Sequence, residues 1–402
     1  MRGKVLSTFC FGVLLLVAGS AQAATGGYER PPLPDDPLQG RLLFEGRKCN
    51  LCHGIAGSRS GIGPSLGEGR FRGTFLELGA AMWNHVPGMS VTLEVTGLAW
   101  PELSSQEAAQ LIVFLSFVDY LGRPGEAAAG ERVFLDEGCD NCHFLGGGKG
   151  DRGPDLAELR RFASPLYVAQ QIWNHGPTMF ESMRDLNMEP PTFQEGDLAD
   201  LSAFIRQTSG PGPRERLLLA PGNPNAGRRL FAEKGCSNCH GPDARGGGEG
   251  PDLSQVDLHR SAEAIAGTMW NHALAMSDTM RARGIGWPDF EDSELADLVA
   301  FLYFLPFADP PGDPGRGGDV FRLRSCADCH GGGGGDPATG TGPDLAGTQA
   351  TVSSEAWVAA LWNHSPVMKK VILGEGRHWP ELTGQDLRDL LAFLRQDTVS
   401  DN

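Results

Sequence analysis

One pattern occurs four times along the chain, and this internal repeat constrains the fold more than any other feature. A Cys-x-x-Cys-His pentapeptide starts four times within 402 residues, at intervals of 90, 97 and 90 residues. In each repeat a Gly-x-x-x-Phe segment precedes the pentapeptide, and a Gly-Pro pair and then a Trp-Asn-His triplet follow it. We therefore predict an array of four small units, numbered 1 to 4 in chain order, instead of one large core.

Helical spacing of apolar residues predicts that every unit is built from helices. Leu295, Leu298, Val299 and Leu302 recur at helical intervals near the end of unit 3, and no alternating strand pattern competes with them. Equivalent apolar runs close the four units at 109–118, 198–205, 295–305 and 387–394. The predicted fold class is all-α: four tandem small domains, each reading helix, loop, helix, loop, helix.

Clusters of proline and glycine place the boundaries of these units. We predict a leader at 1–23, unit 1 at 28–123, unit 2 at 124–210, a Pro-rich linker at 211–225, unit 3 at 226–310 and unit 4 at 311–398. Because the linker belongs to the longest connection and contains several prolines, it should be a semi-rigid extended spacer. We therefore expect two pairs of units, one on each side of the linker, with some freedom between the pairs.

Cysteine usage indicates what the pentapeptides do. Eight of the nine cysteines lie in the four Cys-x-x-Cys pairs, which leaves none for a disulfide framework. A zinc site pooled from two such pairs would not explain a histidine after every pair, and a thioredoxin-like dithiol belongs to an αβ fold. Cys-x-x-Cys-His is instead the attachment signature of c-type haem, in which both thiols add to the porphyrin vinyl groups and the adjacent imidazole binds the iron.

The motif therefore predicts four covalently attached haem c groups, each with one iron. The predicted attachment residues are Cys49, Cys52, Cys139, Cys142, Cys236, Cys239, Cys326 and Cys329. The predicted proximal iron ligands are His53, His143, His240 and His330.

At this point the chain resembles a known family, the class I c-type cytochromes, repeated four times. The matching features are the Gly-x-x-x-Phe helix, the pentapeptide, the Gly-Pro-(Asp/Ser)-Leu loop, a later methionine and an apolar-aromatic closing helix such as the one containing Ala300-Phe301-Leu302. The resemblance implies that the first and last helices of each unit cross. It also implies that the loop proline lies beside the proximal imidazole and that a nearby carbonyl orients the N–H of that imidazole. The loop prolines are Pro64, Pro154, Pro251 and Pro343.

The sixth iron ligand departs from that family. The family's Met-Pro segment before the last helix is replaced by Trp-Pro in units 1, 3 and 4 and by Pro-Pro in unit 2. The methionine found in every unit follows the triplet histidine by four residues, which makes Met89, Met179, Met276 and Met368 the candidate ligands. In three units a proline two residues after that histidine, at Pro87, Pro177 or Pro366, should end the helix and place the methionine on a loop.

Two alternatives to methionine ligation stay open. The triplet histidines, whose imidazoles would give bis-histidine haems of lower potential, are His85, His175, His272 and His364. If histidine and methionine both serve only packing, the iron has an open position. The triplet tryptophans are predicted to lie against the porphyrin, because a small unit needs large apolar side chains to complete its core; they are Trp83, Trp173, Trp270 and Trp362.

The first residues and the charge indicate the compartment and the partners. Arg2 and Lys4 precede an apolar stretch that ends at Ala21-Gln22-Ala23, the pattern of a cleaved secretory signal peptide, so we expect a periplasmic or extracellular protein without a transmembrane segment after cleavage. Cleavage would leave 32 basic and 50 acidic side chains, a formal charge of −18. This charge argues against nucleic acid as a partner and favours redox proteins that carry a basic docking patch.

The leading hypothesis is an electron-transfer protein, not an enzyme, in which iron cycles between Fe(II) and Fe(III) and electrons hop between haems. The alternatives are a cytochrome subunit of a periplasmic oxidoreductase complex and a haem enzyme such as a peroxidase. Catalysis at iron would need an open coordination position and a neighbouring acid-base group, and no unit has a distinctive one.

Overall fold

The computed structural model describes residues 33, 37–55, 61–66, 73–146, 152–161, 164–208, 222–256, 258, 260–331 and 342–395. The predicted leader and most of the predicted linker lie outside these residues. In the described part, regular structure consists of α-helices and short 3-10 helices, with two isolated bridges and no strand, so the all-α prediction is confirmed. None of the described helices combines the length and apolar character needed to cross a membrane.

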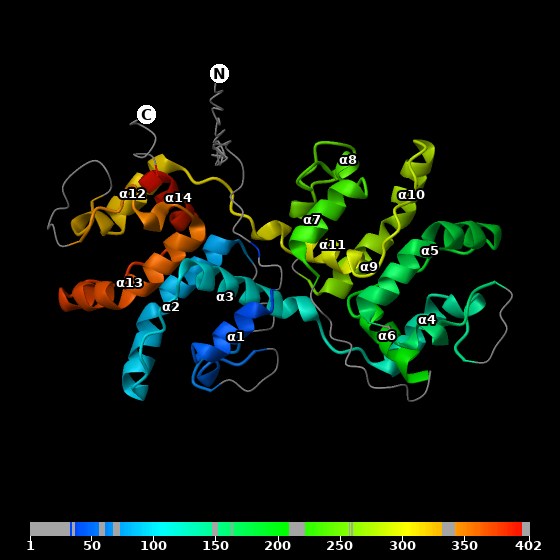
Figure 1. Cartoon of the computed structure of the whole chain (residues 1–402), viewed down its shortest axis with the longest axis horizontal. Helices are drawn as coiled ribbons and strands as arrows, with labels where there is room; N and C mark the ends of the chain where they lie inside the picture. Colours follow the sequence, from blue (N-terminus) through cyan, green and yellow to red (C-terminus); the bar gives the residue numbers. More distant parts are fainter. Residues whose placement is uncertain are drawn as a thin grey trace, which may run out of the picture.

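The long helices follow the predicted order within each unit (Figure 1). Unit 1 contains α1 (Gln39–Gly46), α2 (Phe75–Thr96) and α3 (Ser105–Phe117). Unit 2 contains α4 (Ala127–Asp136), α5 (Pro165–Asp185) and α6 (Asp197–Thr208). Unit 3 contains α7 (Pro224–Glu233), α8 (Ser237–His240), α9 (Ala262–Asn271), α10 (Ala273–Ala282) and α11 (Glu294–Tyr303). Unit 4 contains α12 (Pro314–Leu323), α13 (Ser354–Gly374) and α14 (Gly384–Arg395).

Short 3-10 helices form the start of the pentapeptides of units 1, 2 and 4 and some of the connections, whereas the pentapeptide of unit 3 lies mostly in α8. They are η1 (Cys49–Leu51), η2 (Val118–Leu121), η3 (Cys139–Asn141), η4 (Leu156–Arg161), η5 (Leu253–Gln255), η6 (Leu305–Phe307), η7 (Cys326–Asp328) and η8 (Gln349–Thr351).

The first and last long helices of every unit cross, as the resemblance implies: α1 packs on α3, α4 on α6, α7 on α11 and α12 on α14. The glycine of Gly-x-x-x-Phe allows this close approach, since a Cβ on Gly227 would lie 1.9 Å from the carbonyl oxygen of Asp297. The phenylalanine then packs on an aromatic ring of the last helix, with Phe231 and Phe301 centred 5.4 Å apart. Both residues of the motif therefore serve one helix crossing.

The units pair differently from our expectation. Helix α2 of unit 1 packs on α13 and α14 of unit 4, and α5 of unit 2 packs on α9 and α11 of unit 3. Units 1 and 4 therefore form one lobe, which we call lobe A, and units 2 and 3 form the other, lobe B (Figure 1). The expected pairing of units on either side of the linker is wrong, because complementary surfaces on the middle helices, and not distance along the chain, select the partner.

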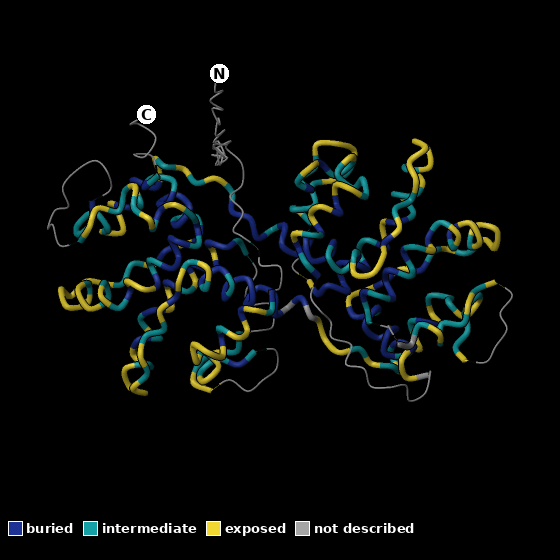
Figure 2. Tube along the Cα trace, viewed as in Figure 1, coloured by how far each residue is buried: buried dark blue, intermediate teal, exposed yellow. Residues whose placement is uncertain are grey.

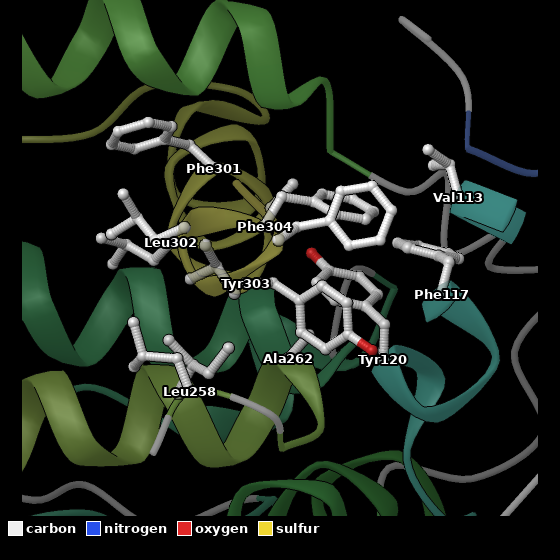
Figure 3. Packing of buried hydrophobic residues seen from close by; sticks show 14 of the residues in the cluster. Val113, Phe117, Tyr120, Leu258, Ala262, Phe301, Leu302, Tyr303 and Phe304 are labelled. Atoms are coloured by element: carbon white, nitrogen blue, oxygen red, sulfur yellow. The ribbon is translucent and has the colours of Figure 1, made fainter. Parts of the chain in front are cut away.

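The two lobes share a buried aromatic cluster, which also contradicts the expected freedom between pairs (Figure 3). Phe117 and Tyr120 of unit 1 pack against Tyr303 and Phe304 of unit 3, with ring centres 5.1 Å apart for Tyr120 and Tyr303 and 6.2 Å apart for Phe117 and Phe304. The Tyr303 hydroxyl donates to the Ser116 carbonyl oxygen. Buried residues accordingly gather within each lobe and where the lobes meet, while the outer ends of α2, α5, α10 and α13 are exposed (Figure 2).

The prolines of the middle helices do not end them. Pro87, Pro177 and Pro366 lie inside α2, α5 and α13, so the predicted loop placement of the methionines in these units is wrong. A proline removes the N–H that would bond to the carbonyl four residues earlier. In each case a tryptophan of the partner unit donates its indole N–H to that carbonyl: Trp379 to Trp83, Trp287 to Trp173 and Trp100 to Trp362, at 3.2, 3.0 and 3.2 Å.

Candidate cofactor sites

Each pentapeptide is folded into a single turn. In the first, Lys48 has a φ of 63°, which turns the chain at the end of α1, and the amide of His53 donates to the carbonyl oxygen of Cys49 at 2.9 Å. The same amide bond closes the other three turns at 2.8, 3.0 and 2.9 Å. This places two thiols and an imidazole on one turn in every unit, as attachment to one porphyrin edge requires.

Burial affects the first cysteine of each pair. All eight cysteines of the pairs are unbridged. Burial raises the pKa of the first thiol of each pair to about 11, at Cys49, Cys139, Cys236 and Cys326. A raised pKa disfavours the thiolate form that dithiol exchange uses. Among the described residues, no group of three or more His, Cys, Asp and Glu side chains converges as a metal-ligand cluster.

The carbonyl of the loop proline orients the pentapeptide imidazole in all four units. The Nδ1 atom of His53 lies 3.0 Å from the Pro64 carbonyl oxygen, and the equivalent distances in units 2, 3 and 4 are 3.2, 3.1 and 3.0 Å. A carbonyl at Nδ1 fixes the tautomer and leaves Nε2 for a metal. The glycine before the proline is required for this contact, because a Cβ on Gly63 would lie 2.6 Å from the His53 ring.

The structure contains a cavity of the size and chemistry that a haem needs. In unit 4 a cavity of about 940 Å³ is lined by both thiols of the pair, Cys326 and Cys329, by the proximal His330 and by the opposite helix α13. This volume lies in the range of about 300–1,000 Å³ that is typical of cofactor sites. The thiols and the imidazole therefore open onto one space.

An unpartnered donor at the cavity wall also fits a haem. The indole Nε1 of Trp357 is buried, has no hydrogen-bond partner among the described residues and belongs to a residue that lines the cavity. A buried N–H without an acceptor is costly, by about 1–3 kcal/mol. A haem propionate would supply a carboxylate acceptor, so the residues present fit this group.

In units 1, 2 and 4 both classes of candidate sixth ligand lie on one face of the middle helix, because histidine and methionine are four residues apart. In unit 3, His272 lies between α9 and α10. In unit 4 both His364 and Met368 line the cavity. The ring of His85 lies 5.9 Å from that of His53, and the ring of His364 lies 6.4 Å from that of His330, measured between centroids. Burial, followed by the charge of the facing imidazole, lowers the pKa of His85 and of His364.

The triplet histidines of lobe B are held differently. The Nδ1 atom of His175 lies 2.8 Å from the Gln171 carbonyl oxygen, and the Nδ1 atom of His272 lies 2.8 Å from that of Thr268. Each ring thus bonds to its own helix. The four candidate methionines are partly buried and pack against the core; they are Met89, Met179, Met276 and Met368.

The tryptophan and asparagine of each triplet join two units. The Trp83 indole donates to the Pro380 carbonyl oxygen at 2.7 Å, and Asn84 exchanges two hydrogen bonds with the main chain of Leu382, at 2.7 and 2.9 Å. The triplets at Trp173, Trp270 and Trp362 make the same contacts with their partner units. All four tryptophans are buried. Trp83 of unit 1 lines the cavity of its partner, unit 4.

Sequence reasoning missed one set of acidic residues. An aspartate of the last helix accepts from the main chain at the start of the first helix, as Asp200 does from the Glu126 amide and Asp297 does from the Asn223 amide, both at 2.7 Å. Asp389 accepts equivalently from the Asp313 amide. The aspartates recur beside the closing apolar runs, and this recurrence in register is the signal that distinguishes them from residues of a solvated face.

Comparison with known proteins matches part of the chain. A family model described as Cytochrome c matches residues 224–305 and 315–397, which lie in units 3 and 4. A curated relative, the Cbb3-type cytochrome c oxidase subunit CcoP of Rubrivivax gelatinosus, is 30% identical over 154 residues, covering 38% of this chain and 44% of the relative. The chain thus spans less than half the length of that relative. No solved structure matches significantly.

Proposed function

We propose that this c-type cytochrome, with two matched cytochrome c domains in units 3 and 4, binds one haem in each of its four units and transfers electrons between redox partners. The observation that carries the proposal is the bond between the pentapeptide histidine and the loop proline carbonyl, which has the same geometry in all four units. Units 1 and 2 share this arrangement although the family model does not reach them.

The residues of each unit have separate tasks toward the haem. The paired cysteines would attach the porphyrin, and the adjacent histidine together with a residue of the middle helix would bind the iron. When bound, the haem supplies one-electron chemistry through Fe(II) and Fe(III). The chain contributes a fixed imidazole, a largely apolar cavity and the contacts between units.

Pairing of the units supports hopping within a lobe. In lobe A the Trp83 ring of unit 1 stacks on Trp379 of unit 4 with centroids 4.2 Å apart, and both rings line the cavity of unit 4. In lobe B, Trp173 of unit 2 stacks on Trp287 of unit 3 at 4.4 Å. Electrons are therefore proposed to pass between units 1 and 4 and between units 2 and 3, not between consecutive units alone.

The proposed location is outside the cytoplasm, with export by the predicted leader at 1–23. Apart from the sequence pattern, the two matched cytochrome c domains support this placement. The charge of −16 for the whole chain favours a redox partner with a basic docking patch.

A second candidate function is that of an electron-transfer subunit within a larger oxidoreductase. The partial similarity to a subunit of a cytochrome c oxidase favours it. In that role the same haems would pass electrons to a catalytic partner, and the chain itself would not be the enzyme.

A reductive titration of the purified holoprotein, followed by visible absorption, tests the proposal. The expected result is reversible uptake of four electrons per chain and reoxidation by an external redox partner. Uptake of fewer electrons by a chain with intact Cys-x-x-Cys pairs would contradict the four-site proposal. Copurification with a fixed set of subunits under mild conditions would favour the second candidate function.

A further inference from the structure

The two lobes differ in how the triplet histidine is held. In lobe A the rings of His85 and His364 face the proximal imidazoles of their own units, with centroids 5.9 and 6.4 Å apart and ring planes inclined by 57° and 65°. Each facing pair combines one histidine from a pentapeptide turn with one from a middle helix. The two rings therefore come from opposite walls of a unit.

This separation suits one metal ion between two imidazoles. Metal–imidazole nitrogen bonds of about 2 Å on opposite sides of one ion place the two ring centres about 6 Å apart. Two trans imidazoles can rotate about their common axis, so an inclined pair of ring planes fits as well as a parallel one. In each lobe A unit, the proximal Nδ1 is already occupied by a proline carbonyl.

Among the described residues, lobe B shows no facing pair of imidazoles like those of lobe A. The rings of His175 and His272 each bond through Nδ1 to a carbonyl four residues earlier, which holds them along their own helices. Met179 and Met276 stand one helical turn further along, partly buried against the core. Because the described part of lobe B shows no triplet ring facing a pentapeptide imidazole as in lobe A, the thioethers of Met179 and Met276 are the remaining candidate ligands on this side of their units.

We propose that the lobes differ in the sixth iron ligand: His85 and His364 bind iron in lobe A, while Met179 and Met276 bind iron in lobe B. This inference rests on the proposed function, since it requires a haem in every unit. It replaces the sequence prediction of methionine ligands for Met89 and Met368, which then serve as packing residues, Met89 against the core of lobe A and Met368 at the wall of the unit 4 cavity.

Different ligands would give the lobes different roles. Methionine ligation raises the reduction potential of a haem relative to bis-histidine ligation. Lobe A would therefore contain two haems of lower potential and lobe B two of higher potential. Electrons that enter at lobe A would move downhill to lobe B, so the chain would conduct preferentially in one direction.

The first test uses the unmodified holoprotein. The methionine–iron charge-transfer absorption of the oxidised protein is measured per chain, together with a potentiometric titration. We expect the band intensity of two haems, and two pairs of potentials with the lower pair lacking this band. Band intensity for four haems, or for none, would overturn the inference.

The second test assigns the ligands with matched variants. In lobe A, His85→Ala and His364→Ala should each convert one low-spin ferric haem to high spin in the electron paramagnetic resonance spectrum, whereas Met89→Ala and Met368→Ala should leave the spectrum unchanged. In lobe B, Met179→Ala should remove half of the charge-transfer intensity and His175→Ala should leave it intact. The reverse ranking in either lobe would overturn the assignment there.

The haem count separates the inference from the function on which it rests. Denaturing mass spectrometry of each variant reports the number of attached haems. Four haems with methionine bands from every unit would refute only the ligand assignment, whereas fewer than four haems in the unmodified protein would refute the proposed function.

Discussion

Removal of the Trp379 indole N–H should destabilise lobe A, and replacement of Pro87 should cancel most of that effect. Trp379 donates at 3.2 Å to the Trp83 carbonyl oxygen, which Pro87 leaves without its helical donor. In Trp379→Phe the ring remains but the donor is lost, and the carbonyl belongs to a residue that is only 5% exposed. Leaving such an acceptor unsatisfied costs about 1–3 kcal/mol, and weaker ring stacking adds about 0.5–1.5 kcal/mol.

Pro87→Leu restores an N–H at this position and so closes the helical bond without the tryptophan. Unit 3 has the corresponding pair of residues: Leu274 stands where the other units have proline, and its partner, unit 2, has Pro190 in place of the tryptophan. There α9 ends at Asn271 and α10 begins at Ala273. In the Pro87→Leu background, Trp379→Phe should therefore destabilise only through the loss of stacking. The expected coupling energy between the two substitutions is about 1–2 kcal/mol.

The assay is urea unfolding of the oxidised holoprotein for the four members of this double-mutant cycle, followed by haem absorption. A matched cycle in lobe B uses Trp287→Phe and Pro177→Leu, because Trp287 donates to the Trp173 carbonyl oxygen at 3.0 Å. Strictly additive effects, within about 0.5 kcal/mol, would refute the idea that the tryptophan replaces the bond that proline removes.

Three further predictions concern the proximal ligand, acid stability and partners. A Cβ in Gly250→Ala would lie 2.6 Å from Nδ1 of His240, so this variant should shift the absorption spectrum of one haem. Gly286→Ala is the control, because the space around Gly286 is open and its spectrum should not shift. Equal spectra for the two variants would contradict the account. Burial raises the pKa of Asp200, but hydrogen bonds from Arg123 and the Glu126 amide outweigh it and hold this pKa below its ordinary value. A lowered folded-state pKa stabilises the fold above about pH 4, and this contribution is lost as the pH falls through that pKa. The free energy of unfolding in urea should therefore depend less on pH below about pH 4 in Asp200→Asn than in the unmodified protein. Oxidation by a cationic mediator should slow as salt rises towards about 0.1 M, where the screening length is about 10 Å, and stopped-flow rates that favour an anionic mediator at low salt would oppose this expectation.

Local features of the fold could be predicted because they recur in register. The glycine and phenylalanine of the first helix, the pentapeptide turn and the Gly-Pro loop each make contacts within one unit, so a single unit's sequence contains both partners of each contact. The bond from His240 to the Pro251 carbonyl oxygen, at 3.1 Å, is an example. Such short-range contacts give a fixed spacing between the two residues, which is visible in the sequence of each unit.

The pairing of units was not predicted, because its contacts join segments that lie far apart in the sequence. Trp83 bonds to Pro380 and Asn84 to Leu382, about three units away along the chain. The linker length was a poor guide, since the free energy of closing a longer loop grows only slowly with its length. A usable signal nevertheless existed: unit 3 lacks the helix proline and unit 2 lacks the tryptophan, which marks these two as partners.

The placement of the methionines was predicted wrongly for a related reason. A proline such as Pro87 ends a helix when the carbonyl four residues earlier finds no other donor. Here Trp379 of another unit supplies that donor. Rules that treat a helix in isolation cannot include that donor. The same contact keeps His85 and Met89 on one face of α2. The orientation of the two side chains therefore decides between them as the sixth ligand.

The central claim, one covalent haem in each of four units, is tested most directly by denaturing mass spectrometry of the matured protein and of a Cys139→Ala, Cys142→Ala variant. The account predicts the mass of the polypeptide plus four haems for the unmodified protein and plus three for the variant, because each unit holds its own cofactor. An unmodified protein with fewer than four haems, or a variant that loses more than one, would contradict it.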